Sequence, residues 1–471
     1  IYLMMISIYK FIPVARGLRK RTPKMPIVKT GACFECLGQS FCYVRVQQGP
    51  SLYTRKLVPL PKDWTNVHYK RNYRHTMDSP NSFPSFSEAL EKEILDKEKP
   101  YDGKDPNLES EIKCAWCRES AANNAITLSR CVRCKLVWYC SKECQKEDFD
   151  GHKGYCKKIG KLEASTQRES AALCSTTDHI FSAHAVPQNL FETAAGDFWG
   201  IIVTRDYMRA RMALADEVYH LAYEIETKES WECALNHSLE LLRLCISDNL
   251  GIRYRLPFIL LYLNRDDDAF SFIKYWMDDF DDHYDERRKI HKNSREGEWI
   301  YPRQDGCRYL DIFKECPTVT PKYVDLWFLV ALCIIKMRIV AANKAAQDSL
   351  KLFSKSPTGK SFNDDVTTAI SEFTVGDQKE RSMVENQRRQ VERLMDQIHV
   401  NNPSMLPSII NPMPLKSKPL PQGYSRGKPA EAYLVLNDCN RCFVRTPGAT
   451  AWLEKRFGKR PKYDVSIDYY H

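Results

Sequence analysis

Seven cysteines and one histidine between positions 114 and 156 form the part of the sequence best suited to chemistry. They fall into four pairs: Cys114-x2-Cys117, Cys131-x2-Cys134, Cys140-x3-Cys144 and His152-x3-Cys156. Two intervening residues let the backbone fold back so that both thiolates reach one ion, and a three-residue gap places both ligands on one face of a helical turn. Eight such ligands suffice for two tetrahedral zinc sites with no position left for a water molecule. The sequence therefore predicts two structural zinc ions.

A disulfide framework is the alternative explanation for so many cysteines. Closely spaced pairs, one of which contains a histidine, are more typical of metal ligands. Zinc-bound thiolates need a reducing compartment, so we expect the protein in the cytoplasm, the nucleus or both. The first 24 residues carry six cations and no acidic residue, which leaves mitochondrial targeting as an alternative, although upstream sequence or a basic tail is the preferred explanation.

This ligand pattern resembles the MYND zinc finger, including the stretch Tyr139-Cys140-Ser-Lys-Glu-Cys144-Gln145. The resemblance implies interleaved ligation, which the spacing alone does not distinguish from sequential ligation. One zinc would be held by Cys114, Cys117, Cys140 and Cys144, and the other by Cys131, Cys134, His152 and Cys156.

The same resemblance implies a peptide-binding role, often for proline-containing segments. In peptide-binding MYND fingers a Gln and a Trp on the helix after the third ligand pair line the groove. The matching positions here are Gln145 and Phe149, four residues apart on one expected helical face. Phe149 departs from the usual Trp, and the alternative is that it packs in the small core of the finger.

The elements expected around the finger are mainly helical. Between residues 190 and 395 apolar residues recur at spacings of three and four, and Leu261–Ala269 looks like the turn of a tetratricopeptide-type (TPR-like) repeat. We therefore expect a mainly α fold, in which a small two-zinc finger accompanies a TPR-like α-helical repeat domain whose helix pairs stack to bury their apolar faces.

Composition and motifs divide the chain into seven segments. They are a basic tail or upstream or targeting segment (1–24), an irregular N-terminal region (25–109) with a helix at Ser87–Lys97, the finger (110–158), a linker (159–189), the TPR-like domain (190–395), a Pro-rich segment (396–429) and a C-terminal helical hairpin (430–471). In the last helix Thr446 is the expected N-cap, Pro447 the first residue and Gly458 the stop.

The helical part also resembles a group of eukaryotic MYND proteins with a TPR-like domain. The motifs that carry this resemblance are Gly196-Asp-Phe-Trp-Gly200, Thr204–Arg211, Leu242–Asn249, Asn402–Pro412 and Arg445-Thr-Pro-Gly448. The group has no established activity, so the resemblance informs the architecture more than the function.

Charge and hydropathy limit the kinds of partner that we expect. The chain has 471 residues and a formal net charge of +10, and residues 1–75 hold 14 Lys and Arg residues against two acidic ones. Such a basic end allows weak phosphate attraction, but without a recognition motif we expect nucleic acid not to be the main partner. The most apolar run, Leu326–Ile335, is too short to span a bilayer and predicts a buried helix.

The hypothesis that follows is a non-enzymatic adaptor, in which the finger recognises a partner peptide and the helical domain acts as scaffold. The alternative is a SET-type protein-lysine methyltransferase, because some MYND fingers lie within SET domains. Asn236-His237-Ser238 resembles the start of a SET motif but continues as a helix, without the Cys and Pro of that motif.

Two further groups of residues could imitate chemical sites. Cys33, Cys36 and Cys42 could bind a third zinc with Cys439 and Cys442, although buried free thiols are the preferred explanation. The acidic run Asp278–Glu286 precedes an Arg-Arg-Lys run and predicts a solvated face rather than a metal site.

Overall fold

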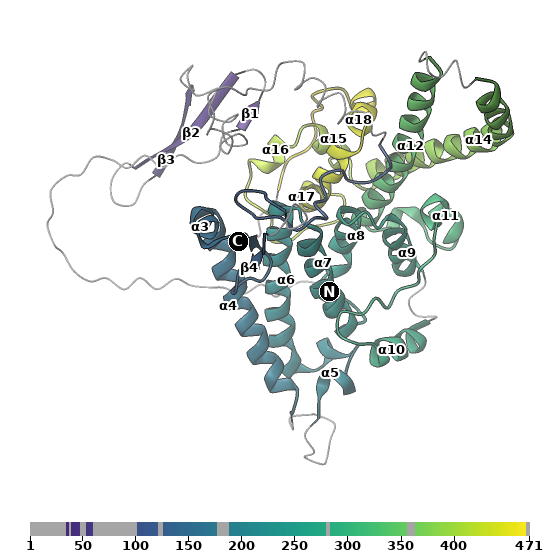
Figure 1. Ribbon diagram of the computed structural model, residues 1–471. Coiled ribbons are helices and arrows are strands. Elements are labelled where there is room, and N and C mark those ends of the chain that lie inside the picture. Colours follow the sequence, from purple (N-terminus) through teal and green to yellow (C-terminus); the bar gives the residue numbers. More distant parts are fainter. Residues whose placement is uncertain are drawn as a thin grey trace. The chain divides into compact units, whose positions relative to one another are not determined.

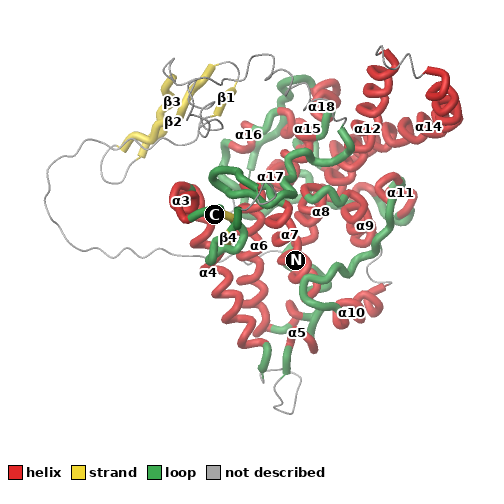
Figure 2. Tube along the Cα trace, in the orientation of Figure 1, coloured by secondary structure: helices red, strands yellow, loops and turns green. Residues whose placement is uncertain are grey.

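The computed structural model describes residues 34–36, 39–47, 53–59, 101–120, 126–176, 188–278, 283–355 and 363–467. The chain divides into two compact units, Ile1–Ser85 and Phe86–His471. The larger unit is mainly helical and contains the finger, so the expected fold class is confirmed (Figure 2).

The smaller unit contains a three-stranded antiparallel sheet where an irregular region was expected. Its strands are β1 (Phe34–Cys36), β2 (Gln39–Gln47) and β3 (Tyr53–Pro59), in the order β1-β2-β3. In the register of the longer pair, Val44 lies opposite Lys56 and Val46 opposite Thr54. Aromatic and β-branched residues in β2 favour extended structure, and this signal outweighs the scattered prolines. The helix expected at Ser87–Lys97 lies outside the described residues.

The finger consists of a short hairpin and two helices that meet at one residue. The strands β4 (Ser129–Arg130) and β5 (Trp138–Tyr139) pair antiparallel, and α3 (Lys142–Glu147) and α4 (Phe149–Leu173) follow. The Ser141 hydroxyl caps α3 by accepting a 3.2 Å hydrogen bond from the backbone N–H of Cys144. Because α4 continues for 25 residues, it occupies the first half of the segment expected as a linker.

The rest of the larger unit is built from helices that follow one another closely (Figure 1). The longer ones are α6 (Arg205–Ile225), α7 (Lys228–Leu244), α8 (Ile252–Tyr262), α9 (Asp266–Met277), α10 (Tyr284–Asn293), α12 (Leu326–Lys355), α14 (Asn363–Asn401), α17 (Pro429–Arg445) and α18 (Ala449–Phe457). Four short α-helices are α5 (Leu190–Thr193), α11 (Ile312–Glu315), α15 (Met405–Ile410) and α16 (Met413–Lys416), and single 3₁₀ turns are η2 (Phe198–Gly200), η3 (Ile202–Thr204), η5 (Cys307–Tyr309) and η6 (Pro321–Tyr323). Helix α6 packs on α7, α7 on α8, and α8 on α9.

Helix α12 lies at the centre of the helical core. It packs against α8, α9, α14 and α17, and all ten residues of Leu326–Ile335 are buried, as the sequence predicts. By length and composition Leu326–Asp348 could cross a membrane, but 83% of its apolar stretch is buried inside the structure, as in the core helix of a globular domain.

The Pro-rich segment packs against the C-terminal helices rather than acting as a linker. Helix α15 contacts α17 and α18, and Met405 and Leu406 are fully buried. The last helix begins at Ala449, two residues later than expected. Gly448, with φ 80°, precedes it because glycine tolerates this left-handed conformation, and the Thr446 hydroxyl instead donates to the Cys442 carbonyl.

Candidate metal centre

The first ligand group joins the start of the finger to α3. The sulfur atoms of Cys114, Cys117, Cys140 and Cys144 all lie within 4.8 Å of one another. The Sγ of Cys140 is 3.5 Å from that of Cys117 and 3.4 Å from that of Cys144. Cys114 is fully buried, whereas the other three are partly exposed.

The second ligand group joins the second Cys-x2-Cys turn to the first turns of α4. The ligand atoms of Cys131, Cys134, His152 and Cys156 lie within 4.8 Å of one another, and all four residues are buried. The His152 Nε2 is 3.4 Å from the Cys131 Sγ and 3.5 Å from the Cys134 Sγ, and the sulfurs of Cys131 and Cys156 are 3.6 Å apart.

Both groups fit a tetrahedral zinc ion. Zn–S bonds of about 2.3 Å place the sulfurs of a tetrahedron about 3.8 Å apart, close to the separations observed. Four thiolates in one group, and three thiolates with an imidazole in the other, are typical donor sets of structural zinc. The prediction of two zinc-binding clusters is confirmed, and the structure groups the eight residues in the interleaved manner that the resemblance implies.

The backbone explains how each Cys-x2-Cys turn presents its sulfurs. In the first turn the N–H of Arg118 donates to the Cys114 carbonyl at 3.0 Å, and in the second the N–H of Lys135 donates to the Cys131 carbonyl at 2.9 Å. Arg118 and Lys135 each adopt a left-handed backbone conformation, with φ of 65° and 58°. Sequence reasoning missed this feature because neither residue is the Gly or Asn that usually signals it.

Electrostatics favour a cation in the buried group. Burial raises the pKa of the Cys131 thiol, but hydrogen bonds from the backbone N–H of Cys134 and from His152 outweigh burial and lower this pKa to about 6. Burial and the neighbouring sulfurs of Cys131 and Cys156 raise the pKa of Cys134 to about 12. The metal-free group therefore cannot carry all its thiolates at neutral pH, and a bound Zn²⁺ would supply the compensating charge and displace the protons.

The finger is fixed to the helical region by contacts outside the metal ligands. The indole Nε1 of Trp138 donates to the Glu229 carboxylate at 2.6 Å, and Arg130 forms an ion pair with the same carboxylate. The backbone of Glu109 pairs with that of Glu226 and Lys228, at 3.0 and 2.8 Å. Helix α4 also packs along α6 (Figure 1).

We expect Trp138→Phe to lower the free energy of unfolding by about 1–2 kcal/mol, because it removes the indole donor to a charged and partly buried carboxylate. The measurement is urea unfolding, with zinc content determined in parallel and expected to stay at two ions per chain. Trp116→Phe is the matched control, since Trp116 is 42% exposed in the first Cys-x2-Cys turn. Equal stabilities of the two variants would contradict the role of the Trp138–Glu229 contact.

The two residues predicted to contact a peptide are both exposed. Gln145 lies on α3, and Phe149, the first residue of α4, is 56% exposed. The ammonium of Lys153 lies 5.2 Å from the Phe149 ring centroid. The alternative in which Phe149 packs in the finger core is therefore wrong. The single helical face expected for the two residues is divided at Asp148, where α3 ends and α4 begins.

The remaining candidate residues do not form a further site in the described part of the chain. Cys439 and Cys442 are completely buried on α17, and burial raises the pKa of Cys442 to about 12, as for free core thiols. Cys33 lies outside the described residues, and Cys36 and Cys42 belong to strands of the smaller unit. Of the acidic run, residues 279–282 are not described and Glu286 is exposed. Asn236-His237-Ser238 lies within α7, as expected.

Comparison with known proteins identifies the finger. The family model of the MYND finger matches residues 114–156, so this segment is a MYND finger. The histone-lysine N-methyltransferase ASHR1 of Arabidopsis thaliana is 34% identical over 76 residues, which are 16% of this chain and 15% of that protein. A SET and MYND domain-containing protein of Dictyostelium discoideum is 41% identical over 51 residues, which are 11% of this chain and 9% of that protein.

These similarities cover a small part of each protein. The chain matches no more than 15% of the length of these two curated relatives. No solved structure matches the chain. The comparisons therefore describe the finger, while the TPR-like character of the helical region stays a prediction.

Proposed function

We propose that this protein is a non-enzymatic adaptor, in which the MYND finger binds a partner peptide and the helical region serves as the scaffold. MYND fingers generally mediate protein–protein interactions, and two saturated zinc groups leave no coordination position for catalysis. The observation that carries the proposal is that Phe149 and Gln145, on the two consecutive helices of the finger, are both exposed. A bound partner that covered the exposed 56% of Phe149 would gain about 1–2 kcal/mol of burial free energy.

A proline-containing segment is the partner that this surface suits best. Such segments already adopt an extended conformation when they are free. They therefore lose little conformational entropy when they bind to an aromatic side chain. The Gln145 side chain can donate to and accept from the backbone of an extended peptide. Because thiolate ligands need a reducing environment, we place the adaptor in the cytoplasm or nucleus.

The scaffold role rests on the succession of packed helices. Helices α6, α7, α8 and α9 pack each on the next, as in TPR-like repeats that cannot bury their apolar faces alone. Asn264, at the turn between α8 and α9, adopts a left-handed conformation with φ 59°, which allows a tight reversal between two helices. These features support the TPR-like proposal for the region from 190 to 395.

We expect the double substitution Gln145→Ala/Phe149→Ala to weaken binding of proline-containing peptides about tenfold or more, because both exposed contacts are removed. The measurement is selection from an immobilised library of proline-containing peptides, followed by fluorescence anisotropy with the best binder. Lys157→Ala is the matched control, since Lys157 is exposed on α4 eight residues after Phe149. Phe149→Trp should retain binding or strengthen it. Unchanged affinity in the double variant would remove these residues from the binding surface.

The alternative function is that of a SET-type methyltransferase, because the two relatives are named as a histone-lysine methyltransferase and a SET and MYND domain-containing protein. Their similarity is confined to the finger region and does not favour a methyltransferase over an adaptor. Calorimetry with S-adenosylmethionine separates the two proposals, because measurable binding of this methyl donor would support the enzyme and contradict the adaptor.

A further inference from the structure

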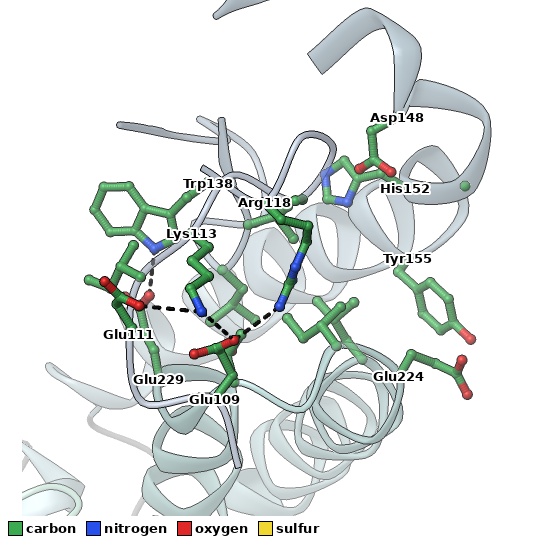
Figure 3. Close-up of a pocket in the computed structure, with 18 of the residues that line it drawn as sticks. Glu109, Glu111, Lys113, Arg118, Trp138, Asp148, His152, Tyr155, Glu224 and Glu229 are labelled. Atoms are coloured by element: carbon green, nitrogen blue, oxygen red, sulfur yellow. Dashed lines mark hydrogen bonds and ion pairs between the residues drawn. The ribbon is translucent and has the colours of Figure 1, made fainter. Parts of the chain in front are cut away.

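A cleft lies between the finger and the helical region. Neither Gln145 nor Phe149, the residues proposed to bind the peptide, lines it. It has a volume of about 380 Å³, within the roughly 300–1,000 Å³ typical of ligand sites. Asp148, just before α4, and His152 and Tyr155 of α4 line one side of the cleft, whereas Phe149 and Lys153 lie on a different face of that helix. The opposite wall comes from the end of α6, including Glu224 (Figure 3).

The floor of the cleft is apolar. Leu136 and Val137 of the finger and Leu221 and Ile225 of α6 line it, and the first three of these side chains are almost completely buried. An occupant therefore needs an apolar portion that can lie on these side chains. The stem of a lysine or arginine satisfies this requirement while its charged head stays near the rim.

The rim carries more negative than positive charge. Five carboxylates and two cationic side chains line the cleft, besides the zinc ligand His152. On one side the charges are already matched, because Lys113 pairs with Glu109 at 3.0 Å and with Glu111 at 3.3 Å, and Arg118 pairs with Glu109 at 3.0 Å. Glu229 is likewise satisfied by Trp138 and Arg130. The excess negative charge must therefore lie on the other side.

Asp148 and Glu224 carry that excess. The Asp148 carboxylate accepts a 2.7 Å hydrogen bond from the neutral Tyr139 hydroxyl, and Glu224 is exposed and forms no ion pair within the described residues. In the close-up, Tyr155 lies between Asp148 and Glu224 (Figure 3). Two carboxylates that form no ion pair with any described residue, at the edge of an apolar floor, complement a single positive side chain.

We propose that this cleft binds a lysine or arginine side chain of a partner segment, with the apolar stem on Leu136 and Leu221 and the charged head between Asp148 and Glu224. The inference goes beyond the proposed function, since it concerns a second recognition surface that does not depend on Gln145 or Phe149. It predicts that a partner contacts the protein at two places. Its extended apolar segment would bind Gln145 and Phe149, and a basic residue would bind in the cleft.

Fluorescent peptides Ser-Leu-Xaa-Leu-Ser, with Lys, Arg, norleucine or Glu as Xaa, test this proposal by anisotropy with the full-length zinc-loaded protein at low salt. The Lys and Arg peptides should bind about tenfold or more tightly than the Glu peptide, and more tightly than the norleucine peptide. Glu224→Lys should weaken Lys-peptide binding about tenfold, and Glu224→Gln about threefold. The matched control is Glu232→Lys, because Glu232 is exposed on α7 and does not line the cleft.

The outcomes distinguish binding in the cleft from binding at Gln145 and Phe149. Loss of Lys-peptide binding in Glu224→Lys but not in Gln145→Ala/Phe149→Ala supports the cleft. Equal binding of the Lys and norleucine peptides would show an apolar occupant and overturn the proposal. Binding that is lost only in the double variant would also overturn it, while the proposed adaptor function would stand. Thermal melting and zinc content should match wild type for Glu224→Lys, since this side chain makes no ion pair in the described structure.

Discussion

Replacing Cys134 by serine is expected to remove one zinc ion and to unfold the part of the finger that this ion holds. Cys134 is a buried member of the group that joins the second Cys-x2-Cys turn to α4. Structural zinc contributes about 10–16 kcal/mol to the folding of isolated zinc-finger peptides, which equals or exceeds the whole stability of a typical domain. Without this metal the three remaining ligands are left as buried polar groups, so the hairpin and the first turns of α4 lose their fixed positions.

Native mass spectrometry is expected to count two zinc ions in wild type and one in Cys134→Ser. Limited proteolysis should then cleave within residues 110–158, while most of the helical circular dichroism remains, because the core around α12 holds no zinc ligand in the described structure. Cys174→Ser is the control, since Cys174 is an exposed cysteine outside both groups. Two retained zinc ions with an intact finger would contradict the assignment of Cys134 as a ligand.

The metal centre could be predicted from the sequence because its ligands lie in short local patterns. Each Cys-x2-Cys turn is fixed by hydrogen bonds between residues four positions apart, such as that from Lys135 to Cys131. The ligand pairing depends on contacts between segments about 20 residues apart, and here the family resemblance supplied what spacing could not.

The boundaries of the finger were harder to predict, for a physical reason. Helix α4 carries two ligands at its start and then continues to Leu173, because its later residues pack on α6. This packing is a tertiary contact with a helix more than 30 residues further on, and it extends a helix that local signals alone would end near the last ligand.

The buried charged residues of α12 are a second feature that local sequence signals could not predict. Lysine and arginine side chains are seldom fully buried unless they are paired, so nothing in the local sequence predicts that Lys336 and Arg338 are buried. In the structure both are buried, and each contacts partners distant in sequence. Arg338 pairs with Asp266 at 2.8 Å, and the Lys336 ammonium donates to the carbonyls of Arg308 and Leu310.

Lys336→Met is expected to alter stability in a way that depends on pH. Burial lowers the pKa of Lys336 to about 7, against the partial opposition of Asp311 and Cys307. In the unfolded chain this pKa is about 10.4, so above that pH neither state is protonated and the lysine carries no penalty. As the pH falls from about 10.4 to 7, the unfolded chain binds a proton that the folded protein does not, and wild type loses stability relative to the variant.

The free-energy difference between wild type and Lys336→Met should therefore shift by roughly 3 kcal/mol in favour of the variant between pH 9.5 and pH 7. The two carbonyls left without a donor destabilise the variant by an amount that does not change with pH, so they affect the offset and not the shift. Urea unfolding at pH 7, 8 and 9.5 measures the shift in this free-energy difference. Lys344→Met is the control, because Lys344 is exposed on the same helix. A difference that stays constant over this range would mean that Lys336 remains charged in the core, held by its two carbonyls and by the Phe270 ring 5.1 Å away.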